Sequence, residues 1–122
     1  LIFSKKLEKL KNLFSIIKSL NFESLVIFCN KKSDVKRLSL EKIFNHHKVV
    51  ILHGDMLQLN RQNSLRSFKE KKSNILIASD VAGRGLDINS ISHVINFDVP
   101  NNTFIFELDL DLIKKYFPSI CH

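Results

Sequence analysis

The chain has 122 residues, of which 25% are charged and 44% are apolar, and this composition excludes a disordered chain and a chain built of membrane-spanning segments. A chain of this length encloses one hydrophobic core, so one domain is the upper limit. The net charge of +7 is concentrated in residues 1–72, with 16 basic against 6 acidic side chains, which is compatible with a polyanionic partner such as nucleic acid. Because 15 of the 19 basic residues are lysines, the charge alone favours an ordinary solvated face over a nucleic-acid surface.

Residues 4–20 carry apolar side chains at steps of three and four with lysines between them, which predicts an amphipathic helix. The side chains expected to face inward are Leu7, Leu10, Leu13, Phe14, Ile17 and Leu20. Residues 25–29 form an unbroken apolar run rich in β-branched and aromatic side chains, which is typical of a strand buried on both faces.

Helices and apolar strands then alternate along the chain. They are expected over 33–45 (helix), 49–52 (strand), 57–71 (helix), 75–78 (strand) and 94–97 (strand). Ser33 or Asp34 is expected to cap the first of these helices. The inward side chains of the two helices are expected to be Val35, Leu38, Phe44, Leu57, Leu65 and Phe68. This alternation predicts a three-layer α/β domain, with a parallel sheet and helices on both of its faces.

Polar residues follow each predicted strand. They are Asn30-Lys31-Lys32, His53-Gly54-Asp55, residues 79–87 and Asp98-Val99-Pro100. Because ligands of parallel α/β sheets gather outside the carboxyl ends of the strands, the functional site is expected at this edge.

Residues 79–88 combine glycines with polar and charged side chains. They include Ser79, Asp80, Gly83, Arg84, Gly85 and Asp87. The glycines allow a tight turn close to a phosphate, the hydroxyl and the guanidinium bind phosphate oxygens, and the carboxylates accept hydrogen bonds from ribose hydroxyls. Spacing alone leaves an ordinary turn between a strand and a helix as an equal alternative.

Several segments resemble motifs of the DEAD-box RNA helicases. Residues 75–88, ILIASDVAGRGLDI, resemble motif V, and residues 25–29, LVIFC, resemble motif IV. Residues 52–56, LHGDM, resemble a segment that the family follows with a Gln and an Arg three positions apart, here Gln58 and Arg61.

Residues 94–100, VINFDVP, are similar to the segment that follows motif V in the same family. All four segments occur in the family's order, over about residues 5–106. The resemblance implies that residues 1–122 are the C-terminal, second RecA-like domain of a helicase core, a domain that closes over ATP and RNA together with a first RecA-like domain.

The resemblance also assigns roles to individual residues. It implies RNA binding by Asn30, Lys31, Gly54, Gln58, Arg61, Ser79, Asp80 and Gly83. It implies nucleotide binding by Gly85 and Asp87 and a supporting catalytic role for Arg84. Gln58 and Arg61 share one face of a helix, and their spacing alone favours a solvated helix end.

The main departure from the family follows Phe106. There the family continues with motif VI, His-Arg-x-Gly-Arg-x-x-Arg, whose arginines stabilise charge on the transferred phosphoryl group. This chain continues at Glu107 with residues that resemble the family's later C-terminal helix. The domain is therefore expected to lack motif VI between 106 and 107, to hold no catalytic arginine finger and to be inactive by itself. The alternative is a degenerate helicase fragment that acts as a non-hydrolysing RNA- or protein-binding module.

The function that the resemblance implies is the coupling of ATP hydrolysis to RNA duplex unwinding or remodelling. The resemblance implies ATP and Mg²⁺ as cofactors, held mainly by a first helicase domain that this chain lacks, and RNA and that first domain as partners. No metal site is expected, because the five histidines lack metal-ligand spacing with carboxylates or cysteines. No membrane partner is expected, because no apolar run approaches the roughly 20 residues that cross a bilayer.

The chain begins at Leu1 and its single methionine is Met56, so an excerpt of a longer protein is expected. Cys29 and Cys121 form no disulfide or zinc framework, and the first residues lack a signal-peptide pattern. These features predict an intracellular, reducing compartment. A role in RNA processing favours the nucleus or nucleolus and leaves the cytoplasm open.

Overall fold

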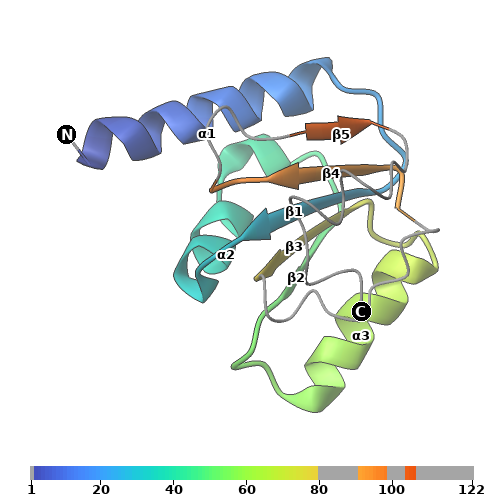
Figure 1. The fold of residues 1–122 in the computed structure, drawn as a ribbon. Coiled ribbons are helices and arrows are strands. Elements are labelled where there is room, and N and C mark those ends of the chain that lie inside the picture. Colours follow the sequence, from blue (N-terminus) through green and yellow to red (C-terminus); the bar gives the residue numbers. More distant parts are fainter. Residues whose placement is uncertain (1, 80–90, 99–103, 107–122) are drawn as a thin grey trace.

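Five strands form one sheet in the computed structural model, which describes residues 2–79, 91–98 and 104–106, with side chains over 7–79 and 91–98 (Figure 1). The strands are β1 (Leu25–Cys29), β2 (Val49–Leu52), β3 (Ile75–Ser79), β4 (His93–Asn96) and β5 (Phe104–Phe106). Their order across the sheet is β2-β3-β1-β4-β5. The first four strands pair in parallel, whereas β5 pairs antiparallel with β4.

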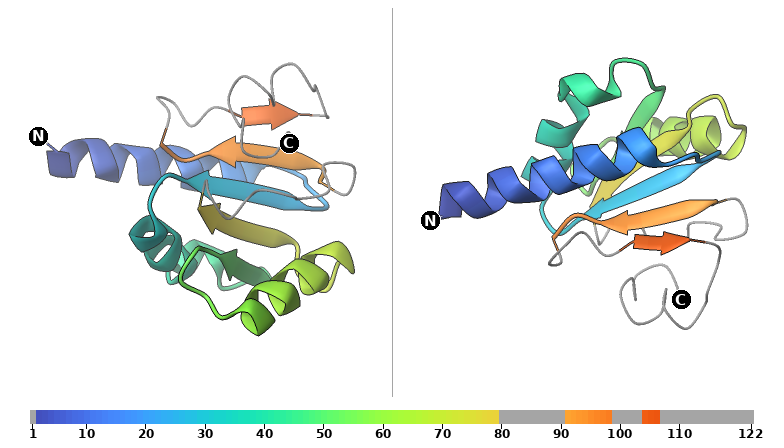
Figure 2. Two further views of the ribbon diagram at one scale, coloured as in Figure 1. Left: turned by 60° about the horizontal axis from the view of Figure 1, so that its bottom comes forward. Right: turned by 90° about the horizontal axis from the view of Figure 1, so that it is seen from above.

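The sheet lies between two layers of helices. The helical segments are α1 (Ile2–Ser19), α2 (Lys32–Ser39), the 3-10 turn η1 (Lys42–Phe44) and α3 (Gln58–Lys69). Leu13 and Ile17 of α1 and Leu38 of α2 pack in one apolar cluster, and Phe68 of α3 packs in a second cluster. Figure 2 shows α1 and α3 on opposite sides of the sheet. The predicted three-layer α/β architecture is confirmed.

Strand β1 divides its side chains between the two clusters. Val26 and Phe28 pack with α3, while Leu25, Ile27 and Cys29 pack with α1 and α2. Alternate residues of a strand face opposite sides of the sheet, so a central strand with helices on both sides is apolar at every position. All five residues of β1 are buried, as the unbroken apolar run predicts.

The predicted helix over 33–45 is wrong in its length and in its cap. α2 ends at Ser39, and the backbone N–H of Leu40 donates to carbonyls of the preceding turn before the separate turn η1 begins. The residue that precedes α2 is Lys31, which makes no capping hydrogen bond through its side chain. Asp34 lies inside the first turn and is buried, so it does not cap the helix from outside.

Two leucines that were expected to face inward are exposed. Leu57 is 73% exposed because it precedes α3 in an extended conformation and so lies off the helix face. Leu7 is 44% exposed; it lies toward the N-terminal end of α1, which extends past the edge of the sheet (Figures 1 and 2). The inward placement of Leu13, Ile17, Val35, Leu38, Phe44 and Phe68 is confirmed.

Candidate nucleic-acid interface

The carboxyl ends of the four parallel strands meet at one edge of the sheet. In the pairing register, Cys29 of β1 lies beside Ser79 of β3, and Leu52 of β2 lies beside Ala78. Phe28 lies beside Asn96 of β4. The described residues that follow β1, β2 and β4 therefore emerge at the same edge, as was expected for the site.

Hydrogen bonds donated by backbone N–H groups join the carboxyl ends of β1 and β4. The N–H of Asn30 donates to Oδ2 of Asp98 over 2.6 Å, and the N–H of Phe97 donates to the carbonyl of Phe28 over 2.8 Å. Asp98 is held in place by its own N–H, which donates to Oδ1 of Asn96 over 3.0 Å. The backbone N–H of Asn30 is engaged in this way, and its side chain is exposed at the edge.

The loop after β2 folds around a buried imidazole. His53 is only 5% exposed, and its Nδ1 accepts a hydrogen bond from the N–H of Asp55 over 3.3 Å. Its own N–H points to Sδ of Met56 at 3.4 Å, and its carbonyl accepts from the N–H of Met56 at 3.3 Å. Gly54, at the tip of this loop, is exposed, and a Cβ added there would meet no atom within 4 Å.

Cations from two helices surround this loop. Burial lowers the pKa of His53, and the nearby charge of Lys36 lowers it further, with smaller contributions in the same direction from Lys32 and Arg61. Asp55 opposes them but does not reverse the direction. The positive charges therefore outweigh the one carboxylate around the imidazole.

Asp55 is itself engaged by one of these cations. Lys32 forms an ion pair with its Oδ2, and that hydrogen bond and charge lower the pKa of the Asp55 carboxyl below its usual value. Both side chains are more than half exposed. The pair thus screens one lysine only and leaves Lys36 and Arg61 available to an anion.

Six of the eight residues assigned to RNA lie in the described part of the chain, and the structure places all six at or beside this edge. Asn30 and Lys31 follow β1 and Gly54 follows β2, and all three are exposed. Gln58 and Arg61 lie in the first turns of α3, the former exposed and the latter half-buried. Ser79 ends β3 and is 6% exposed. The other assigned residues lie outside the described residues: Asp80, Gly83, Arg84, Gly85 and Asp87.

The sequence placed Lys32 in the loop at the expected edge but assigned it no role, and it did not point to Lys36. Both lie on α2, which begins at Lys32, and residues four apart share a helix face. The sequence signal that could have identified them is their spacing of four residues in a helix that begins just after β1. Asp98 was noted in its loop, but its bond to Asn30 joins residues 68 positions apart and needed the structure.

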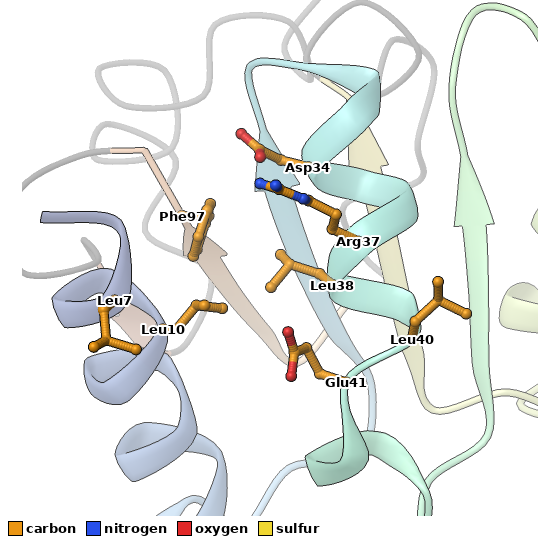
Figure 3. A pocket seen from close by; sticks show the side chains of 8 residues that line it. All are labelled: Leu7, Leu10, Asp34, Arg37, Leu38, Leu40, Glu41 and Phe97. Carbon is orange, nitrogen blue, oxygen red and sulfur yellow. The ribbon is translucent and has the colours of Figure 1, made fainter. Parts of the chain in front are cut away.

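A groove of about 370 Å³ lies between α1, α2 and the end of β4 (Figure 3). Its lining consists of Leu7, Leu10, Asp34, Arg37, Leu38, Leu40, Glu41 and Phe97. Figure 3 shows the Asp34 and Arg37 side chains together at one end and the Glu41 carboxylate at the other, with Leu38 between them. Leu40 is 84% exposed. None of the six described residues assigned to RNA lines this groove.

Among the residues that the structure describes, no group of three or more His, Cys, Asp or Glu side chains is arranged to hold a metal ion. Within the same residues, no helix has the length and apolar character that a bilayer crossing requires.

The family model described as "Helicase conserved C-terminal domain" matches residues 5–113. A curated relative, the DEAD-box ATP-dependent RNA helicase 21 of Oryza sativa subsp. japonica, is 37% identical over 103 residues, which are 83% of this chain and 14% of the relative. The chain spans between 14% and 24% of the length of the curated relatives it matches.

Two solved structures are similar in both fold and sequence. The yeast splicing factor Prp28, a DEAD-box protein, has a TM-score of 0.65 and 37% identity, and the match covers 78% of this chain and 21% of that one. Dbp5 of S. cerevisiae, in a complex with RNA and ADP BeF3, has a TM-score of 0.61 and 33% identity over 80% of this chain and 24% of that one.

Proposed function

The chain belongs to the family of helicase C-terminal domains, in its DEAD-box RNA helicase branch, and from this premise we propose that its carboxyl edge binds the sugar-phosphate backbone of RNA. In this proposal the domain binds RNA and ATP jointly with a first RecA-like domain and couples ATP hydrolysis to duplex unwinding or remodelling. The relatives named above are ATP-dependent RNA helicases or DEAD-box proteins, and the Dbp5 structure contains RNA and a nucleotide.

The observation that supports RNA binding most directly is the excess of positive charge around the loop after β2. Lys32 and Lys36 lie on α2 and Arg61 lies on α3, and the positive charge of each lowers the pKa of the buried imidazole of His53. Lysine and arginine at a strand edge bind phosphate oxygens without reading base identity. The proposed interaction is therefore with the backbone of any RNA sequence.

The two loops offer complementary groups to an RNA strand. Asn30 and Lys31 present an amide and an ammonium after β1, and the exposed Gly54 lets a backbone come close to the loop after β2. Gln58 and Arg61 add a hydrogen-bonding amide and a guanidinium at the start of α3. Such groups bind phosphates and 2′-hydroxyls, which all RNA sequences share.

The nucleotide side of the proposal rests on residues outside the described part of the chain. Gly85 and Asp87 are proposed to contact the nucleotide, with Arg84 in support, and ATP and Mg²⁺ are proposed to be held mainly by the first domain. Because Glu107 follows Phe106 directly and the chain carries no motif VI sequence, the chain by itself is proposed to lack ATP turnover.

RNA binding is tested with the 122-residue chain and a fluorescein-labelled single-stranded RNA. Arg61→Ala is expected to weaken binding, and it should make the slope of log affinity against log salt shallower by about 0.7, the value for one phosphate contact on a single strand. Arg66→Ala is the matched control, because Arg66 lies on the same helix, is exposed and is not assigned to the site. Equal effects of the two changes would contradict the proposal.

The second candidate function is an RNA- or protein-binding module without hydrolysis. Two observations favour it: the jump from Phe106 to Glu107, and the apolar groove of Figure 3 with its exposed Leu7 and Leu40. Sequencing the transcript across codons 106 and 107 separates the candidates. A motif VI segment at that place supports the helicase, and a true junction supports the binding module.

The ATPase activity of the longer protein containing this chain is a further test. Asp87→Ala and Arg84→Ala are each expected to abolish RNA-stimulated ATP hydrolysis if the domain takes part in turnover. Full activity in both variants would show that the nucleotide residues were assigned wrongly.

A further inference from the structure

A second hollow with basic walls lies on the face of the domain that α1 covers, near the edge where the strands begin. It has a volume of about 430 Å³, within the range of pockets that hold small ligands. It is bordered by the end of α1 and by η1 with the residues that follow it. None of the residues assigned above to RNA or nucleotide lines it.

The floor of this hollow is apolar and well supported. Ile17 is 4% exposed, and Leu20 and Ile43 are half-buried against the same apolar cluster. A floor of this kind suits the flat or carbon-rich part of a ligand, since covering it removes apolar surface from water.

The walls of the hollow carry nitrogen donors and no carboxylate. Lys18 comes from the last turn of α1 and Lys42 from η1, and His46 and His47 follow η1. Within the described residues, no ion pair involves Lys18 or Lys42. Glu41, the residue before Lys42, lines the separate groove of Figure 3. The residues that line the hollow therefore include two cationic side chains and no anionic one.

One of the imidazoles is held in a defined orientation. The ring of His47 stacks on Phe22 with centroids 5.6 Å apart, and its Nδ1 lies 3.4 Å from Nδ2 of Asn74. Oδ1 of Asn74 accepts from the N–H of Lys48 at 3.0 Å, so the amide nitrogen of Asn74 is the donor to His47. The proton of the neutral ring then sits on Nε2, where it remains available to a ligand oxygen.

We propose that this hollow is a second anion site, one that binds a nucleotide unit with its phosphate at Lys18 and Lys42 and its sugar and base on the apolar floor. The required chemistry is a phosphate joined to a less polar group. A free mononucleotide and one nucleotide of an RNA strand both satisfy it. An RNA strand bound here would lie away from the carboxyl edge, so the site goes beyond the function proposed above.

The test compares the full chain with the double variant Lys18→Gln/Lys42→Gln. The probes are uridine monophosphate and a labelled oligouridylate of about eight nucleotides, a length typical of one single-strand site. The matched control is Lys11→Gln/Lys69→Gln, which removes the same charge from exposed positions outside the hollow. Thermal unfolding of both variants is measured to confirm that they fold.

The site variant is expected to lose about tenfold in affinity, and for the oligonucleotide its salt slope should become shallower by about 0.7, the value for one phosphate on a single strand. In the unmodified chain the imidazole NMR signals of His46 and His47 are expected to shift as either probe is added. Loss for uridine monophosphate alone identifies a free nucleotide as the ligand, and loss for the oligonucleotide alone identifies RNA. The proposal is overturned if neither probe binds, or if site and control variants behave alike with both probes.

Discussion

Asp98 and Asn30 tie the ends of two neighbouring strands together. Oδ2 of Asp98, just after β4, accepts the backbone N–H of Asn30, just after β1, over 2.6 Å. The other carboxylate oxygen lies 3.6 Å from Nζ of Lys9 on α1, and the Asp98 side chain is only 15% exposed. One carboxylate thus links the sheet edge to a helix and fixes the path of the chain into Lys31.

Asp98→Ala is expected to lower the free energy of unfolding by about 1.5–3 kcal/mol, the range for a hydrogen bond to a charged group that is lost from a partly buried site. Asp98→Asn keeps an acceptor oxygen and should cost less. Urea denaturation measures both changes. Asp55→Ala is the control, because the Asp55 pair with Lys32 is exposed and contributes little to stability. An Asp98→Ala variant as stable as this control would show that the link to Asn30 is not stabilising.

Lys71 adopts a left-handed conformation where α3 ends, with φ of 62°. The N–H of Lys72 donates to the carbonyl of Ser67 over 2.9 Å, and the N–H of Lys71 donates to the carbonyl of Phe68 over 3.1 Å. This is the hydrogen-bond pattern of a Schellman motif, in which glycine is usual at the left-handed position because a Cβ is strained there.

Lys71→Gly is therefore expected to raise the free energy of unfolding by about 0.5–1 kcal/mol. The ion pair of Lys71 with Glu23 is lost as well, but both side chains are more than 60% exposed, so that loss is small. Lys71→Ala, which loses the ion pair and keeps the Cβ, is the control and should show no gain. A glycine variant no more stable than the alanine variant in urea denaturation would contradict the strain argument.

The layers of the fold were predictable because they depend on local patterns. The apolar run from Leu25 to Cys29 and the three-and-four spacing of Leu13 and Ile17 each reflect one element meeting the core. The same reasoning was wrong for Leu57, whose extended backbone before α3 places it off the helix face. It also missed β5, because three residues are too few to establish a period.

The location of the candidate site was predictable from the sequence, whereas the contacts of its individual residues were less so. The rule that ligands bind beyond the carboxyl ends of parallel strands located Asn30 and Gly54 at the edge. It gave no indication that His53 is buried there, because a histidine after a strand is as often solvated. The contributions of Lys36 and Asp98 depend on contacts between segments far apart in the chain, and single-sequence patterns do not encode such contacts.

The buried imidazole of His53 makes the stability depend on pH. Burial, then the charge of Lys36, holds the pKa of His53 below its ordinary value of 6.5. The unfolded chain therefore binds this proton first as the pH falls, so the stabilisation is complete above about pH 6.5 and decreases as the pH drops through the ordinary value toward the folded one. Burial lowers the pKa of His93 as well, which adds in the same direction.

Urea denaturation at about pH 7.5 and about pH 5.5 is expected to show lower stability at the lower pH. His53→Asn, whose side-chain oxygen can still accept the N–H of Asp55, should reduce this difference. His46→Asn is the control, because His46 is exposed, and it should leave the difference unchanged. An unchanged pH dependence in the His53 variant would mean that other groups cause the loss.

Gly54 separates the requirements of folding from those of RNA binding. A Cβ at this position would meet no atom within 4 Å, so Gly54→Ala is expected to change the free energy of unfolding by less than about 0.5 kcal/mol. If an RNA backbone approaches the loop after β2 as proposed, the added methyl group occupies that space and RNA affinity falls several-fold in fluorescence anisotropy. Gly54→Val should weaken binding more than Gly54→Ala, because it fills more of the same space. A Cβ at position 54 meets no atom of the domain, so the valine side chain would occupy the space in front of the loop. Undiminished RNA binding by a folded Gly54→Val variant would therefore place the RNA elsewhere on the domain.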